Sequence, residues 1–309
     1  MLNVSEFEDI DDATSSLISM KAAYSDVAES DIIDKINQVG NNFSISTDGL
    51  ASALQRSASA LKTAGNDIDE SIGLITAGNQ VVQDPESVGA AMRVISLRLT
   101  GTSQAKQELS ELNEDTDGVI TTVSKLRETI MNATKVASNG YKGVDLLDKN
   151  GNYRSTAAVL QDIADIYSEI EETDKKTKSN NINLLLETIS GKNRANTAAS
   201  ILQSPDVLRD AIEASKNAKG SANRENETYL SSLEAHITQL QTQLQELATV
   251  TINSDMFKGV IDTATAFLNI VTQILDKLPL ISTAIGGFTG LKLSQAGLGK
   301  QLNARSNLS

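Results

Sequence analysis

Cysteine and tryptophan are absent from the sequence, and aromatic residues make up only 3% of its 309 positions. Without cysteine the chain can form no disulfide or zinc–thiolate site, and it has no thiol nucleophile. Because aromatic side chains dominate most cores and ligand pockets, their scarcity argues against a deep small-molecule site. The chain has three prolines and is rich in alanine, leucine and isoleucine, a composition that favours helices packed through small and aliphatic side chains.

Basic residues are scarce in the first third of the chain. Residues 1–91 carry 15 acidic and 4 basic side chains, a net charge of −11 out of −13 for the whole chain. Such a surface repels the phosphate backbone, so we expect no direct sequence-specific or non-specific nucleic-acid binding there. In a helical protein, acidic residues of this kind most often form a solvated surface. The first nine residues have neither the basic nor the apolar region of a secretory signal.

The residues that catalysis or metal binding would need are also missing. His236 is the only histidine, and one imidazole without a second histidine or a cysteine cannot build a typical zinc site or catalytic triad. Gly191-Lys192 lacks the upstream glycine and the following Ser or Thr of a phosphate-binding loop. Asp148–Asn152 resembles the first half of a calcium loop, but Tyr153 stands where that loop needs glycine. We therefore expect no enzyme, no cofactor, no metal and no catalytic residue.

Three helix starts stand out between residues 46 and 101. Ser46 precedes the first apolar series. Asp67 and Glu70 have the spacing of a capping box. Asp84-Pro85 places a cap before a proline at the first helical position. The apolar positions that follow these starts predict three short helices able to pack antiparallel: Leu50, Leu54, Ala58 and Leu61 before Gly65; Ile68, Ile72 and Ile75; and Val88, Met92, Ile95 and Leu99 before Gly101.

Further helices and one β-hairpin are predicted between residues 119 and 220. The hairpin spans Val144–Ser155 and turns at Asn150-Gly151. Ser155 then caps a helix, Ser204-Pro205-Asp206 repeats the pattern of a cap before proline, and Gly220 is the best candidate break in the chain. The apolar positions of the four helices are Val119, Val123, Leu126 and Ile130; Val159, Ile163, Ile166 and Ile170; Ile182, Leu185, Leu186 and Ile189 before Gly191; and Val207, Leu208, Ala211 and Ile212.

The most regular apolar pattern follows Gly220. Six apolar residues step by three and four over nearly three heptads, which is the spacing that buries a stripe between supercoiled helices. We define them as the seam: Leu230, Leu233, Ile237, Leu240, Leu244 and Leu247. The seam predicts self-association into a homo-oligomer, and one helix of an intramolecular bundle would show the same pattern.

Residues 256–291 are the most apolar stretch. Asp262 and Asp276-Lys277 divide it into uncharged runs that are each shorter than the roughly 20 residues a membrane-spanning helix needs. Six apolar residues within it fall on one helical face, which suits an amphipathic helix against a partner or a membrane better than a span. This predicted face consists of Val260, Ala264, Phe267, Leu268, Val271 and Leu275. After Lys292 the tail is polar and basic.

Several blocks of the sequence, in this order, resemble the core region of phage tail tape-measure proteins of long-tailed phages and Gram-positive prophages. They are Ser46-Thr47-Asp48-Gly49-Leu50-Ala51-Ser52-Ala53-Leu54 and the residues up to Ala58; Ala64–Ala77; Pro85–Arg93; and Ser96-Leu97-Arg98-Leu99. Thr116-Asp117-Gly118, Gly143-Val144-Asp145, Leu184-Leu185-Leu186-Glu187 with Gly191-Lys192, and residues 253–276 are similar to downstream parts of the same family.

The resemblance implies a structural protein without a catalytic mechanism. Tape-measure proteins lie extended inside the tail tube, and their helical length sets the length of the tail. The implied partners are further copies of the chain, tail-tube and distal-tail proteins, tail assembly chaperones and, during DNA ejection, the host membrane. The implied locations are the virion tail and, during assembly, the host cytoplasm. A fully helical chain of this length spans at most roughly 460 Å, a short ruler, so we expect a fragment or a truncated prophage product.

The expected fold class is all-α: a bundle of short helices with one small β-hairpin, then a long heptad-patterned helix and an apolar helical segment. The expected division is a helical tape-measure core (1–138), a hairpin with helices (139–220), a coiled-coil-like helix (221–255), the apolar segment (256–291) and the basic tail (292–309). A membrane-active helical protein, such as a pore-former or channel component, is the alternative function, and residues 260–291 fit both. A soluble helical adaptor needs only the bundle.

Overall fold

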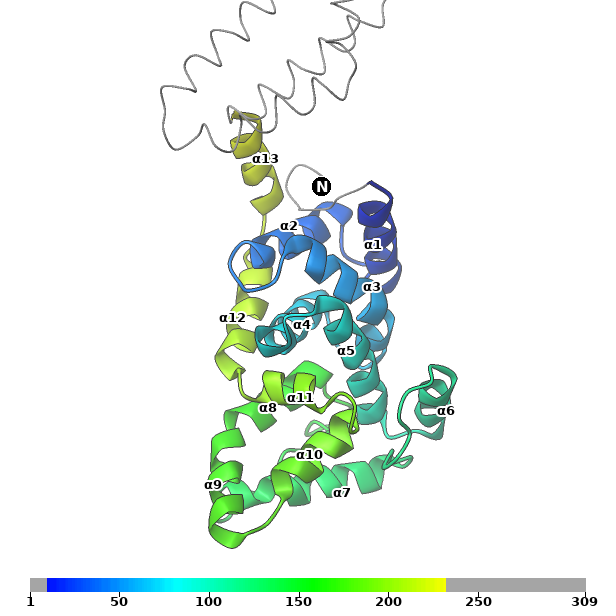
Figure 1. Cartoon of the computed structure of the whole chain (residues 1–309), viewed down its shortest axis with the longest axis vertical. Coiled ribbons are helices and arrows are strands. Elements are labelled where there is room, and N and C mark those ends of the chain that lie inside the picture. The colour runs from blue at the N-terminus through cyan, green and yellow to red at the C-terminus, as the bar shows by residue number, and fades with distance from the viewer. Residues whose placement is uncertain (1–9, 232–309) are drawn as a thin grey trace, which may run out of the picture. The chain divides into compact units, whose positions relative to one another are not determined.

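Helices are the only regular secondary structure in the computed structural model over residues 10–231, which are the residues that it describes (Figure 1). The expectation of an all-α fold is confirmed for this part of the chain. The α-helices are α1 (Ile10–Ala23), α2 (Glu29–Gly40), α3 (Thr47–Thr63), α4 (Ile68–Val82), α5 (Pro85–Thr100), α6 (Ser103–Glu111), α7 (Val123–Thr134), α8 (Thr156–Asp165), α9 (Tyr167–Thr177), α10 (Asn181–Ser190), α11 (Ala195–Leu202), α12 (Pro205–Lys216) and α13 (Ser221–Ser231), with a 3-10 turn η1 at Lys135–Ala137.

The three helix starts predicted between residues 46 and 101 are confirmed, and so are their caps. The Ser46 side chain accepts a hydrogen bond from the backbone N–H of Gly49, and the Asp84 side chain accepts one from Ser87. Asp67 and Glu70 form both hydrogen bonds of a capping box. Each cap satisfies an N–H that the first helical turn leaves without a partner, so these helices begin where the local sequence directs them.

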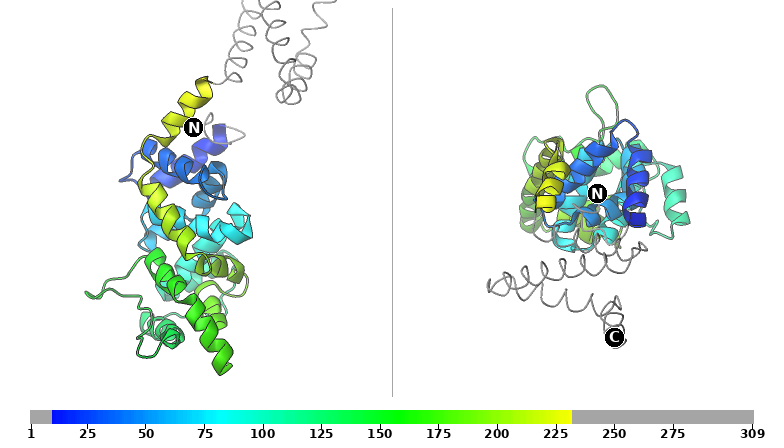
Figure 2. Two further views of the ribbon diagram at one scale, coloured as in Figure 1. Left: turned by 90° about the vertical axis from the view of Figure 1, so that its left-hand side faces the viewer. Right: turned by 90° about the horizontal axis from the view of Figure 1, so that it is seen from above.

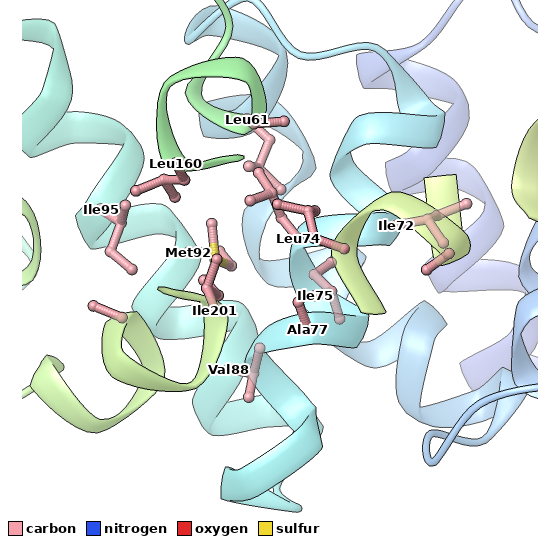
Figure 3. Close-up of a cluster of buried hydrophobic side chains, with 14 of the residues drawn as sticks. Leu61, Ile72, Leu74, Ile75, Ala77, Val88, Met92, Ile95, Leu160 and Ile201 are labelled. Atoms are coloured by element: carbon pink, nitrogen blue, oxygen red, sulfur yellow. The ribbon is translucent and has the colours of Figure 1, made fainter. Parts of the chain in front are cut away.

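Helix α4 lies at the centre of the bundle. Nine consecutive residues, Ser71 to Asn79, are buried on every side of this helix. Its main neighbours are α12, α11, α3 and α5. Figure 3 shows Ile72, Leu74 and Ile75 of α4 among apolar side chains from α3, α5, α8 and α11. A helix that is buried around its whole circumference needs a core on every side, and the surrounding helices supply one continuous cluster that runs from Ala13 to Ala211.

A second, smaller cluster joins α6 to the outer face of α5. Ala105 and Leu109 of α6 are buried against Val94 and Leu97, and Val119 from the following loop packs on them. The predicted helix face that began at Val119 is therefore wrong at its start: α7 begins at Val123, because Val119 is used to cover this second cluster.

The predicted β-hairpin is wrong. Residues 144–155 form a loop closed by one isolated antiparallel bridge between Leu147 and Tyr153, without a strand. Backbone donors that a ladder would need bind side chains instead: Val144 N–H donates to Thr134 Oγ1 (2.8 Å), and Leu147 N–H to Asp145 Oδ1 (3.0 Å). The turn around Asn150-Gly151 does form, and the segment remains a loop that follows the helices.

The predicted single helix after Ser155 is wrong in one respect. Ser155 caps it as expected, with its Oγ 3.2 Å from the backbone nitrogen of Ala158, but the helix breaks at Ile166 into α8 and α9. Ile166 has φ −115° and ψ 9°, and its N–H bonds to Ile163. No glycine or proline marks this break. The other predicted helices are confirmed as α10 and α12, although Ser204 makes no side-chain cap.

Candidate functional site

Two surface hollows in the described part of the chain each contain an arginine. One hollow of about 230 Å³ lies over α3 and α5 and includes Arg93, and another of about 350 Å³ lies beside α7 and includes Arg127. Both arginines are held in ion pairs, Arg93 with Glu108 and Arg127 with Asp145. Within residues 10–231 no three His, Cys, Asp or Glu side chains are placed to hold a metal ion.

The residues predicted to form interaction surfaces lie almost entirely beyond the described residues. Leu230, the first position of the seam, is in the last turn of α13. The other five seam residues, His236 and the whole predicted face from Val260 to Leu275 lie outside the described residues. No helix among residues 10–231 has the length and hydropathy to span a membrane.

Helices α3 and α5 pack closely on each other, and both carry blocks of the family resemblance. Gly89 of α5 packs directly on α3, and a Cβ at this position would lie 2.5 Å from the carbonyl oxygen and 2.8 Å from the Cα of Ala53. Gly49 of α3 faces the ring of Pro85, and a Cβ at residue 49 would lie 2.8 Å from Pro85 Cγ. Real Cβ atoms do not approach other atoms this closely, so Gly89 allows α5 to pack on the backbone of α3, and Gly49 leaves room for the Pro85 ring at the start of α5.

A buried arginine organises a second junction. Arg98, near the end of α5, is only 1% exposed. Its Nη2 donates to the carbonyl oxygens of Asp115 (2.8 Å) and Asp117 (3.0 Å), and its Nη1 donates to the carbonyl oxygen of Glu187 (3.3 Å). The guanidinium thus holds the loop after α6 and the last turn of α10 against α5. A cation suits the carbonyl end of a helix, which carries partial negative charge.

The burial of Arg98 affects both the pKa of its guanidinium and the space that the guanidinium needs. Burial lowers the pKa of its guanidinium, and the nearby acidic groups, Asp115 first among them, oppose that shift. The guanidinium also needs space. Gly191, with φ +68°, ends α10, and a Cβ there would lie 2.7 Å from Nη2 of Arg98. Only glycine meets both requirements, a left-handed backbone and an open space beside the arginine.

Ion pairs surround this junction. Arg194 binds Glu114 at 2.5 Å, with both side chains mostly buried, and Lys192 lies 3.8 Å from Asp117 at the surface. Three blocks of the resemblance therefore meet here: Ser96–Leu99, Thr116–Gly118, and the pair of segments around Glu187 and Gly191. Gly191-Lys192, which is no phosphate loop in sequence, has a structural role at Arg98.

Another polar cluster resembles catalytic chemistry only in composition. Lys35 of α2 and Ser215 of α12 both donate to Asp69 Oδ1, each at 2.5 Å, and Lys35 also donates to the carbonyl oxygen of Ser215 (3.2 Å). Ser215 is completely buried, so no substrate reaches its hydroxyl. The three residues tie α2, α4 and α12 together, and buried groups that satisfy one another specify one packing arrangement.

Sequence reasoning did not single out Arg98, Lys35 or Asp69. A signal for Arg98 was available: it is a lone charge in a run of α5 whose other members, from Val94 to Leu99, are apolar or small. A buried stripe tolerates a charge only where partners satisfy it. Nothing in the sequence indicates which partners those are, because the three carbonyls belong to segments 17 to 89 residues away.

Comparison with known families gives one match. The model of the family described as phage-related minor tail protein matches residues 1–185, which is more than half of the chain. The matched region contains α1 to α9, and with them the α3–α5 contact and Arg98. No solved structure matches the chain.

Proposed function

The chain belongs to the family of phage-related minor tail proteins, and from this we propose that it is a tape-measure protein of the virion tail. In this role it templates tail length and tail assembly through helices and assists the ejection of DNA. The match over residues 1–185 carries the proposal. Membership of the family supports a structural role in the phage tail. The more specific assignment as a tape-measure protein rests in addition on the resemblance of the sequence blocks described above.

The described unit is suited to attachment and assembly more than to measuring length. A single helix of residues 10–231 would be roughly 330 Å long. Within residues 10–231 the longest helix, α3, has 17 residues and so spans roughly 25 Å. We therefore assign the length-setting role to the heptad-patterned segment that follows Gly220. The folded unit, with its glycine contact and its Arg98 junction, serves as a rigid module next to that segment.

The proposed partners follow from this division. The seam from Leu230 to Leu247 associates with the same seam in other copies of the chain. Tail-tube and distal-tail proteins surround the assembled copies, and tail assembly chaperones cover them beforehand. The face from Val260 to Leu275 contacts one of these partners or, during ejection, the host membrane.

Tail length in virions tests the proposal. Four additional copies of residues 230–250 preserve the heptad register and add about 125 Å of helix. We expect tails longer by about that distance in electron micrographs. A matched control inserts a Gly/Ser segment of equal length after Asn150, which is exposed in a loop of the folded unit, and leaves the length unchanged.

The two outcomes separate the parts of the proposal. Unchanged tails with the seam insertion would reject length templating while leaving a structural role intact. Purified tails that lack the chain by mass spectrometry would reject the tail component itself.

A further inference from the structure

Helix α2 has two different faces. Ile32, Ile36 and Val39 are buried in the main core. The opposite stripe is polar: Asp34, Asn37 and Asn41 follow one another at spacings of three and four, which places them on one side of the helix. Helix α13 packs mainly on α2, although the two are far apart in sequence. Figures 1 and 2 show α13 beside α2 at one end of the unit.

The polar stripe holds the beginning of α13. The Asp34 carboxylate accepts hydrogen bonds from the backbone N–H groups of Gly220 (2.6 Å) and Ala222 (3.0 Å). Asp34 thereby caps α13 from a position more than 180 residues earlier. The α13 sequence supplies no cap of its own, because Gly220 precedes its first residue.

Two further side chains extend this contact along α13. The Asn37 side chain, 1% exposed, donates to Ser221 Oγ at 2.9 Å, and the Asn41 side chain donates to the Glu225 carboxylate. Every member of the stripe on α2 therefore binds one of the first residues of α13 or its cap.

Apolar burial contributes little to the same contact. Between Asn217 and Thr228 the only buried apolar side chains are those of Ala218 and Ala222. Helix α12 differs: its Leu208 and Ala211 are completely buried, and Gly73 lets it approach α4 closely. Because apolar burial is the main stabilising contribution to helix packing, α12 is fixed in the core, while residues 220–228 are held on α2 mainly by hydrogen bonds.

We propose that α13 is a latch: a helix held on α2 by this polar stripe, which detaches as one element while the rest of the unit stays folded. Gly220, with φ +76°, separates it from α12 and is the point at which it detaches. Residues 232–309 follow α13 directly in the sequence, so a pull along the chain from that segment reaches the folded unit through α13. The latch therefore couples that segment to α2, and it holds whether or not the chain measures tail length.

Hydrogen exchange in the full-length chain tests the latch. Asp34→Ala removes the shared cap, so amides of residues 221–228 should exchange roughly fivefold faster, the factor that corresponds to loss of an N-cap. Amides of α12 and of residues 71–79 in α4 should keep their protection. Asp31→Ala changes an exposed carboxylate on the same helix and should leave exchange in α13 unchanged.

A cross-link gives the reverse test. Since the chain has no cysteine, Asn41→Cys with Glu225→Cys places the only two thiols where the native side chains touch, and a short bifunctional thiol reagent can join them. In the Asp34→Ala background the cross-link should restore protection of residues 221–228. Loosening of α12 together with α13 in Asp34→Ala would overturn the latch, as would unchanged exchange in α13 or a cross-link that restores nothing.

Discussion

Gly89 lies against the backbone of Ala53, so closely that a Cβ on residue 89 would be 2.5 Å from the Ala53 carbonyl oxygen. Glycine is a poor helix former, and replacing it by alanine in a free helix stabilises by about 0.5–1 kcal/mol. At position 89 in α5 we expect the opposite effect, so that alanine destabilises the protein. The atoms that a new Cβ would meet belong to the main chain of α3, which cannot rotate away as a side chain can.

Gly89→Ala should therefore lower the free energy of unfolding by roughly 1–3 kcal/mol, the usual cost of overpacking. Urea denaturation measures the change. The double variant Gly89→Ala with Ala53→Gly should be no more stable than Gly89→Ala alone, because the clash is with backbone atoms that remain. A stabilised Gly89→Ala variant would show that α3 and α5 do not pack in this way.

Arg98→Met should be among the most damaging changes in the unit. It leaves three main-chain carbonyls without their donor in a buried position, and we expect a loss of roughly 2–4 kcal/mol in the free energy of unfolding. Arg93→Met on the same helix breaks a half-exposed pair with Glu108 and should cost at most about 1 kcal/mol. Equal effects of the two substitutions in urea denaturation would contradict the role assigned to Arg98.

The buried hydroxyl of Tyr24 leads us to expect a loss of stability at high pH. Its hydroxyl lies 2.6 Å from Ser71 Oγ, and because Ser71 donates its own proton to the Asp67 carbonyl oxygen, Tyr24 is the donor. Burial raises the pKa of Tyr24 to about 12, against about 10 in an unfolded chain. The folded state thus favours the protonated phenol. Its contribution is fully present below pH 10 and disappears as the pH rises through 12.

Comparing the wild type with Tyr24→Phe isolates this contribution. At pH 9 the variant should be less stable by roughly 0.5–1.5 kcal/mol, the value of one buried hydrogen bond. The wild type should then lose roughly 2 kcal/mol more than the variant between pH 10 and 12. Parallel stability curves for the two proteins over this range would show that Tyr24 does not titrate with a raised pKa.

Self-association through the seam is a separate prediction. If the partner helix belongs to another copy, Leu240→Asp with Leu244→Asp buries unpaired charge in the interface, and the oligomer should dissociate while α1 to α12 stay folded. If the partner lies in the same chain, the variant should unfold locally without a change in assembly. Sedimentation of both proteins distinguishes these cases, and a wild type that stays monomeric at high concentration would contradict the oligomer.

Local signals in the sequence located the helices that carry them. Ser46, Asp67 and Asp84 act within three residues of themselves, so their caps could be predicted without knowledge of the fold. The break at Ile166 could not, because the apolar spacing continues through it and only tertiary packing requires the bend. The hairpin failed for a similar reason: Asn150-Gly151 directs the turn, but Thr134, outside the segment, takes a backbone donor that a strand would use.

The candidate site depended still more on long-range contacts. The resemblance identified segments around Arg98, Asp117 and Glu187 without showing that they meet. Asp34 could not be assigned to α13 from sequence at all, since a carboxylate that caps a helix 186 residues later has no local pattern. What could be predicted was therefore the position of helices with a local cap or a regular apolar spacing, and what could not was which helix each polar side chain would bind.

The burial of α4 on all sides also limits what other molecules can recognise. An antibody raised against the peptide of residues 71–79 finds no accessible epitope in the folded unit, because every side chain in that stretch is covered. The same antibody binds once the bundle opens. Antibody binding to residues 71–79 therefore distinguishes the open bundle from the folded one. Intact tails that are labelled would contain an open bundle, and unlabelled tails a folded one.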